Sequence, residues 1–209
     1  MITALDALAR LRDGNRRLVA NQTTAPALSD QARRAALVAG QEPFAIVLGC
    51  SDSRVPAELV FDQGFGDLFV IRVAGNIVAP SQIGSVEFAA ARFDTRLVVV
   101  MGHSQCGAVI ATLEELLGHA NNQSRNLRSI VDRVRPSVEA LLSSRREDDA
   151  EAVVRDAVRA NVRASVNHLR HGSELLEQLI RNAGLLVAGA EYSLETGIVT
   201  FFEGVSDAG

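Results

Sequence analysis

The sequence predicts an α/β fold, a mainly parallel central sheet of about four strands plus an antiparallel edge strand, flanked by helices. Three observations predict it. Short, continuously apolar runs recur along the chain, as in strands that are buried on both faces of a sheet. Helix-like segments separate these runs, which is the alternation that a parallel sheet needs. The length of 209 residues suits one domain better than two, since domains average about 150 residues.

Four apolar runs are the expected parallel strands: residues 44–48, 68–71, 97–101 and 185–188. The expected helices among them are residues 81–93, 106–117 and 149–169. Residues 195–197 (Glu-Thr-Gly) predict a turn into a last strand at 198–202, placed antiparallel on an edge. Residues 124–169 are rich in Arg and are expected to form a solvated outer layer of helices.

Two helices are expected before the first strand. Residues 5–19 carry apolar side chains at helical spacing, and Thr3 and Asp6 can form a capping box at their start. A second, shorter helix is expected from its N-cap Ser29 to Ala39. No repeat and no linker composition marks a domain boundary. We therefore expect a single α/β domain over residues 1–209, with residues 1–40 as an N-terminal helical arm.

Composition excludes several classes of protein. An apolar fraction of 47% is enough for a core and excludes intrinsic disorder. All 21 basic residues are Arg, so no lysine is present for a pyridoxal-phosphate Schiff base or a Walker-A phosphate loop. The net charge of −4 argues against nucleic-acid binding through bulk positive charge. Without a signal-peptide pattern or an apolar run near ~20 residues, we expect a cytoplasmic protein that spans no membrane.

The two cysteines and one histidine follow the ends of expected strands. Cys50 comes directly after the first strand, and His103 and Cys106 come after the third. Because the carboxyl ends of parallel strands share one edge of a sheet, these side chains can meet. Two thiolates and an imidazole are good Zn²⁺ ligands, and three protein ligands with an open fourth position are typical of catalytic zinc.

Two other interpretations of these residues stay open. The cysteines could be buried and inert, with His103 as an ordinary core histidine. Alternatively, Cys50 could be a nucleophile with Arg54 as its oxyanion partner. The phosphatase loop places five residues between Cys and Arg, however, whereas three intervene here. The strand-end positions favour the metal site.

At these residues the sequence resembles the β-class carbonic anhydrases. The resemblance is carried by Cys-Ser-Asp-Ser-Arg at residues 50–54 and His-Ser-Gln-Cys-Gly at residues 103–107. It extends through residues 55–58, 69–72, 74–76 and 84–88. It implies a carbonate dehydratase, which hydrates carbon dioxide reversibly to bicarbonate and a proton by zinc-bound hydroxide, with one Zn²⁺ per chain.

The resemblance also implies roles for individual residues. Cys50, His103 and Cys106 are the implied zinc ligands, and Asp52 and Arg54 match the family's catalytic pair beside the metal. The implied substrate-binding residues are Gln41, Phe69, Phe88 and Gly107, partly contributed across a dimer interface. Phe88 departs from the Tyr that plant-type members often carry, so no role of a phenolic hydroxyl carries over to this position.

Asp52 is expected to alternate between two partners. A carboxylate two residues from a zinc ligand can itself fill the fourth position, which closes the site, whereas a pair with Arg54 leaves it open. Bicarbonate-regulated members of the family carry a Trp three residues before the first Cys ligand. That position is Val47 here, and the chain has no Trp. We therefore expect the plant-type, non-allosteric subtype, open under most conditions.

The resemblance implies an assembly as well. We expect a homodimer or a higher even homo-oligomer such as a homotetramer. The helix at residues 5–19 packs in that case either on a partner subunit or on its own chain. Two alternative functions remain: a carbon disulfide or carbonyl sulfide hydrolase on the same scaffold, and an inert zinc-binding interaction protein whose metal is capped by Asp52.

Overall fold

A computed structural model describes residues 2–24, 30–119, 124–143 and 150–205 of the chain. Its centre is a five-stranded sheet of order β2-β1-β3-β4-β5, in which the first four strands are parallel and β5 is antiparallel on the edge. The strands are β1 (Ala45–Gly49), β2 (Leu68–Arg72), β3 (Leu97–His103), β4 (Leu186–Tyr192) and β5 (Val199–Glu203). The predicted fold class is confirmed.

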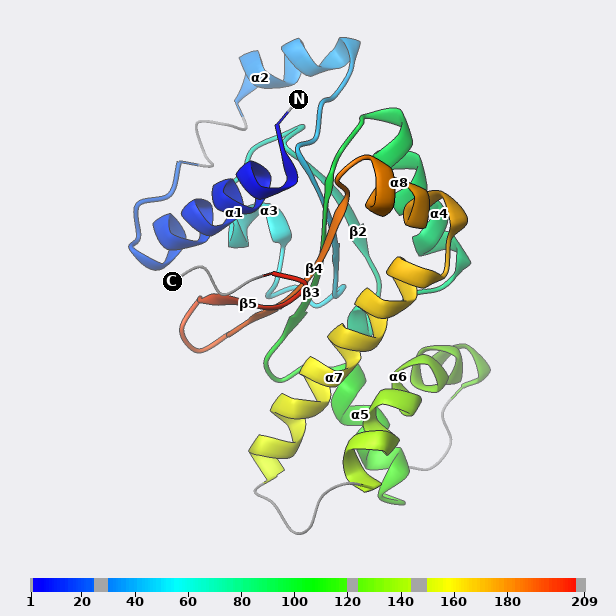
Figure 1. The fold of residues 1–209 in the computed structure, drawn as a ribbon. Helices are drawn as coiled ribbons and strands as arrows, with labels where there is room; N and C mark the ends of the chain where they lie inside the picture. The colour runs from blue at the N-terminus through cyan, green and yellow to red at the C-terminus, as the bar shows by residue number, and fades with distance from the viewer. Residues whose placement is uncertain (1, 25–29, 120–123, 144–149, 206–209) are drawn as a thin grey trace.

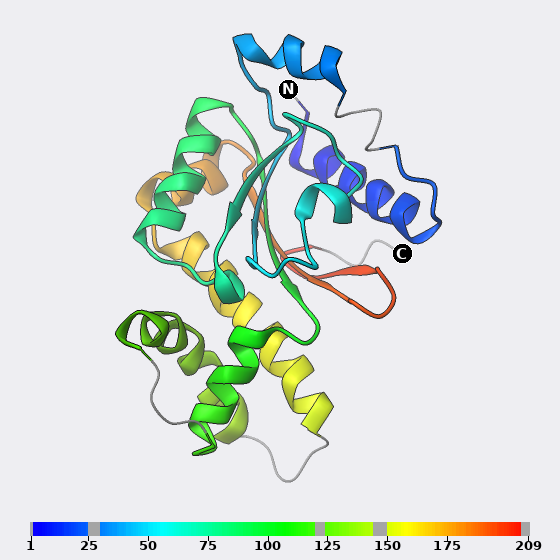
Figure 2. The same ribbon diagram turned by 180° about the vertical axis from the view of Figure 1, so that it is seen from behind.

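Helices cover both faces of the sheet (Figures 1 and 2). They are α1 (Ala4–Val19), α2 (Gln31–Ala36), α3 (Ala57–Val60), α4 (Pro80–Arg92), α5 (Gly107–Leu116), α6 (Arg125–Ser143), α7 (Ala150–His171) and α8 (Glu174–Asn182), with two short 3₁₀ turns, η2 (Leu37–Ala39) and η3 (Ala74–Asn76). One face packs on α4, α7 and α8, and the other packs on α1 and α3. Every residue of β1 and β3 is buried, as their continuously apolar sequences predict.

Helix α7 lies against the sheet, which corrects the expectation of a solvated outer layer. Its residues Val158, Val162 and Val166 are fully buried or nearly so. The approach is close because the strands offer glycines there: a Cβ on Gly102 or Gly189 would lie 2.6 or 2.9 Å from a methyl carbon of Val162. The Arg-rich composition reflects only the outer face of an amphipathic helix.

The helical arm packs on its own chain in this structure. Thr3 caps α1 by accepting a hydrogen bond from the Asp6 N–H, as predicted, and Leu8 and Leu11 are buried on the α1–α3 face of the sheet. Helix α2 is capped by Asp30, whose side chain accepts from Arg33 N–H. The expected cap, Ser29, lies outside the described residues. Within the described ranges, no helix has the length and apolar character needed to cross a bilayer.

Beyond the carboxyl end of the sheet, α5, α6 and the first turns of α7 form a helical layer of their own (Figure 1). Its buried side chains include Val109, Val134 and Val158, which pack around both cysteines. The end of the sheet that carries Cys50 and His103 is therefore covered by the apolar faces of these helices. The two sulfurs and the imidazole are shielded from bulk solvent in this position.

Candidate metal centre

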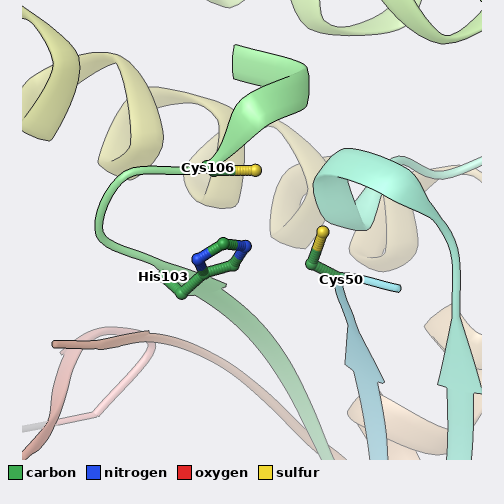
Figure 3. A group of neighbouring side chains, drawn as sticks. All are labelled: Cys50, His103 and Cys106. Atoms are coloured by element: carbon green, nitrogen blue, oxygen red, sulfur yellow. The ribbon is translucent and has the colours of Figure 1, made fainter. Parts of the chain in front are cut away.

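Two neighbouring strands and the start of a helix position the three predicted ligands. Cys50 directly follows β1, and His103 is the last residue of β3, which pairs with β1 in parallel. A turn through Gln105, whose φ is 55°, brings the chain back so that Cys106 forms the N-cap of α5. Figure 3 shows the two sulfurs and the imidazole pointing toward one another.

The donor atoms are close enough to share one ion. One ligand atom from each of Cys50, His103 and Cys106 lies within 4.8 Å of the others. All three residues are buried, with exposed fractions of 5%, 0% and 1%, and neither cysteine forms a disulfide. The sequence could not show whether these three side chains lie close enough to bind one ion, and in the structure they do.

The imidazole has one nitrogen engaged and one without a partner. His103 Nδ1 lies 2.8 Å from the carbonyl oxygen of Ser104, to which only a protonated Nδ1 can donate. The Nε2 atom, buried and without a hydrogen-bond partner, then carries the lone pair. A buried unpaired nitrogen beside two sulfurs fits a zinc ion, because a metal would satisfy it.

The two cysteine thiols influence each other's ionisation. A hydrogen bond from Cys106, together with contacts from His103 and the N–H groups of Asp52 and Gly75, lowers the pKa of Cys50 to about 4 against the opposing effect of burial. The same contact with Cys50, with burial, raises the pKa of Cys106. The pair therefore holds one thiolate readily, and a cation is what would stabilise the second.

Asp52 and Arg54 form a two-pronged ion pair beside the cluster. Arg54 Nε donates to Asp52 Oδ1 at 2.9 Å and Arg54 Nη2 donates to Oδ2 at 2.8 Å. The pair holds the pKa of Asp52 well below its usual range, so the carboxylate is ionised. Asp52 Oδ2 still lies 4.0 Å from His103 Nε2, close to the donors but outside hydrogen-bond distance.

Arg72, which the sequence analysis did not single out, fixes the loop that carries Cys50 and Asp52. Its Nε donates to the Cys50 carbonyl at 3.0 Å and its Nη2 to the Asp52 carbonyl at 2.6 Å. Arg72 pairs in register with Gly49 at the end of β1. A cation at the end of the strand next to β1 was the signal that could have revealed this role.

The predicted substrate-binding residues divide into two groups. Gly107 begins α5 next to Cys106, at the site. Gln41 precedes β1 at the opposite end of the strand from Cys50, and lines a cavity of about 630 Å³ at that end. Phe69 and Phe88 on α4 belong to an aromatic cluster, and Phe69 lies opposite Ile46, four residues or roughly 13 Å back along β1 from Cys50. Within one chain, Gln41, Phe69 and Phe88 do not reach the three donor atoms.

The chain is similar to known proteins in its sequence and in its fold. The family described as "Carbonic anhydrase" matches residues 45–199. The chain is 37% identical to "Carbonic anhydrase 2" of Mycobacterium tuberculosis over 95% of its length and 93% of that protein. It is 39% identical to "Carbonic anhydrase" of Mycolicibacterium smegmatis, with the same shares covered. A solved structure described as one of two tetrameric β-carbonic anhydrases of Sordaria macrospora superposes with a TM-score of 0.70 at 26% identity, over 81% of this chain and 85% of that one.

Proposed function

The chain belongs to the β-class carbonic anhydrase family, and we propose that its reaction takes place at Cys50, His103 and Cys106 with Asp52 and Arg54 as the catalytic pair. It is a zinc-dependent carbonate dehydratase, which interconverts carbon dioxide with bicarbonate and a proton. The observation that carries the assignment of the site is the convergence of two buried sulfurs and an unpaired imidazole nitrogen within 4.8 Å.

The three ligands would hold one zinc ion per chain through Cys50 Sγ, His103 Nε2 and Cys106 Sγ. When bound, zinc supplies Lewis acidity, which makes water a strong nucleophile near neutral pH. The two thiolates cancel the formal charge of the cation, so this ligand set acidifies water less than three neutral imidazoles would. Groups around the ligands must compensate, and Asp52 is the nearest of them.

Asp52 would accept a hydrogen bond from the attacking water and orient a lone pair of that water toward the substrate. Arg54 makes this possible by holding both carboxylate oxygens, which keeps Asp52 ionised and away from the ligands. Carbon dioxide itself is small and apolar, so it needs little binding beyond an apolar pocket.

The Asp52–Arg54 pair supports an open, non-allosteric state of the plant-type subtype. In a closed state, Asp52 would leave Arg54 and occupy the fourth metal position. We propose that the open state dominates at neutral and alkaline pH, since hydroxide competes with the carboxylate. Structures of the zinc-loaded protein at acidic and alkaline pH test the exchange: Asp52 bound to Arg54 at both would refute it.

We propose a homodimer or a higher even homo-oligomer in which Gln41, Phe69 and Phe88 of one chain line the substrate pocket of another. Two observations support this. These residues lie away from the site of their own chain, and the Phe88 side chain is 54% exposed although its ring packs against Phe69 and Phe93. An exposed aromatic cluster is typical of a surface that a partner covers.

Stopped-flow hydration of carbon dioxide, with zinc analysis, tests the function. The purified protein should carry about one zinc per chain and turn over carbon dioxide. Chelator-stripped protein should lose this activity and regain it on addition of zinc, whereas Cys50→Ser should lose zinc and activity together.

Turnover of carbon disulfide or carbonyl sulfide alone would instead favour a hydrolase of sulfur analogues. A bound metal that is inert at every pH would favour the zinc-binding interaction protein.

A further inference from the structure

A tight turn of the main chain lies against the sulfur of Cys50. The turn is η3 (Ala74–Asn76), and its Gly75 N–H donates to Cys50 Sγ with an N···S distance of 3.3 Å. Gly75 and Asn76 have φ angles of 70° and 42°, so two consecutive residues adopt the left-handed backbone. Such a conformation persists where the surrounding structure holds it in place.

Helix α7 provides that support through two buried side chains. Asn161 Nδ2 donates to the Gly75 carbonyl at 2.8 Å, and Ser165 Oγ donates to the Asn76 carbonyl at 3.0 Å. Asn161 is 1% exposed and Ser165 is 5% exposed, and the two lie one helical turn apart on the same face. They fasten the turn to a helix that begins more than 70 residues later in the chain.

Buried carbonyl groups need donors in any protein, so these two hydrogen bonds are by themselves ordinary. They matter further because the same turn makes a third hydrogen bond, from the Gly75 N–H to the sulfur of Cys50 in the proposed zinc site. If the turn rotated, the Gly75 N–H would leave Cys50 Sγ. An N–H···S hydrogen bond draws electron density from a thiolate, which matters where two thiolates already neutralise the charge of the metal.

We infer that Asn161 and Ser165 are positioning residues of the zinc site: they hold the Gly75 N–H on Cys50 Sγ and so set how strongly that sulfur donates to the metal. This inference rests on the proposed function, because it requires Cys50 to be a ligand. Neither side chain touches the metal or the substrate. Both act through the main chain of the turn.

The test compares Asn161→Asp with Asn167→Asp in the full-length protein. Asn161→Asp keeps the size of the side chain but replaces the donor with a carboxylate that repels the Gly75 carbonyl. Asn167 lies on the exposed face of the same helix, so its variant makes the same change away from the turn. Ser165→Ala, which removes one hydroxyl, is the second and milder variant. The measurements are zinc affinity by chelator competition, the sulfur-to-metal charge-transfer band of the Co²⁺-substituted protein, and the melting temperature without metal.

Asn161→Asp should weaken zinc binding about tenfold, because Cys50 Sγ loses the N–H that positions and stabilises it for the metal. It should also move the charge-transfer band to lower energy, because the sulfur without this hydrogen bond is a stronger donor. Ser165→Ala should change both in the same direction by less, and Asn167→Asp should change neither. A lower melting temperature with unchanged zinc affinity and band would overturn the inference, since the two residues would then be structural only. If Asn161→Asp does not fold, Ser165→Ala decides by the same criterion. Wild-type protein that binds no zinc would instead refute the proposed function.

Discussion

At the metal centre, one hydrogen bond decides which nitrogen of an imidazole can bind a cation. His103 Nδ1 is taken by the Ser104 carbonyl, and Nε2 faces the sulfurs without a partner. Arg54 makes a similar selection for Asp52, since it occupies both oxygens of a carboxylate that would otherwise be a competing ligand. At both residues, the hydrogen bonds with neighbouring groups determine which lone pairs remain free to bind a cation.

Replacing Arg54 tests whether it restrains the carboxylate of Asp52. In Arg54→Gln, the carboxylate of Asp52 loses its two-pronged partner and is free to turn toward the ligands, 4.0 Å from His103 Nε2. We expect kcat/KM for hydration at neutral pH to fall about 10- to 100-fold, with partial recovery at alkaline pH. Stopped-flow profiles against pH measure this, and Arg128→Gln on the exposed surface of α6 is the control. Unchanged activity at neutral pH would show that Arg54 does not restrain Asp52.

Glu195 gives a pH prediction for stability. Its own backbone N–H, with the hydroxyls of Ser104 and Ser193 at 2.9 Å, lowers the pKa of the Glu195 carboxyl. A carboxyl with a lowered folded-state pKa stabilises the fold above its unfolded pKa of ~4.3, and this stabilisation is lost as the pH falls through the folded value. Metal-free wild type should therefore melt higher than Glu195→Gln near neutral pH, and the difference should shrink below about pH 4. A difference that is constant over this range would contradict the prediction.

Among the elements, the strands can be predicted from the sequence, but what each helix packs against is harder to predict. The buried runs at β1 and β3 are apolar because both faces of a parallel sheet are covered, and this pattern is visible without a structure. The four Arg of α7 favour a solvated layer for this helix, although its valines face the sheet. The glycines that admit it, Gly102 and Gly189, lie in strands distant in sequence, so only the fold reveals the contact.

The packing of α1 depends on a glycine at its contact with α3. A Cβ on Gly14 would lie 1.8 Å from the carbonyl oxygen of Phe61, which is backbone and cannot move aside. Gly14→Ala should lower the free energy of unfolding by about 3 kcal/mol. The matched control is Gly84→Ala in α4, where nothing in the same chain lies within 4 Å of the new Cβ; both changes are measured in the Phe88→Arg protein, in which this face of α4 should be free of a second chain. It should raise the free energy of unfolding by about 0.5–1 kcal/mol. Chemical denaturation measures both, and equal effects of the two changes would contradict this account of α1.

For the whole molecule, the topology is what made the site predictable. Cys50 and His103 are far apart in sequence, and the rule that parallel strands end at one edge was enough to bring them together. For Arg72 the sequence shows only a cation at the end of a strand, and for Asn161 beneath the Gly75 turn it shows nothing, because hydrogen bonds to main chain leave no motif. Gln41, matched only by resemblance, lies at the far end of β1 within its own chain.

The proposed assembly predicts a loss of both association and activity when the aromatic cluster is charged. Phe88→Arg places a cation where we expect a second chain to pack, so the oligomer should dissociate and activity should fall at least about tenfold. Sedimentation velocity and stopped-flow assays measure the two effects. Leu117→Arg is the control, since Leu117 is similarly exposed, at 56%, but lies beyond the C-terminus of α5. An unchanged assembly with unchanged activity in Phe88→Arg would refute this interface.

Zinc-edge X-ray absorption of the purified wild-type protein addresses the ligand set directly. We predict two sulfur scatterers at about 2.3 Å, one imidazole nitrogen at about 2.0–2.1 Å and one further light atom. The Cys50→Ser protein, loaded with zinc at the highest occupancy it reaches, should show at most one sulfur. Zinc surrounded only by nitrogen and oxygen in the wild type would mean that Cys50 and Cys106 do not bind it, and the proposed centre would be wrong.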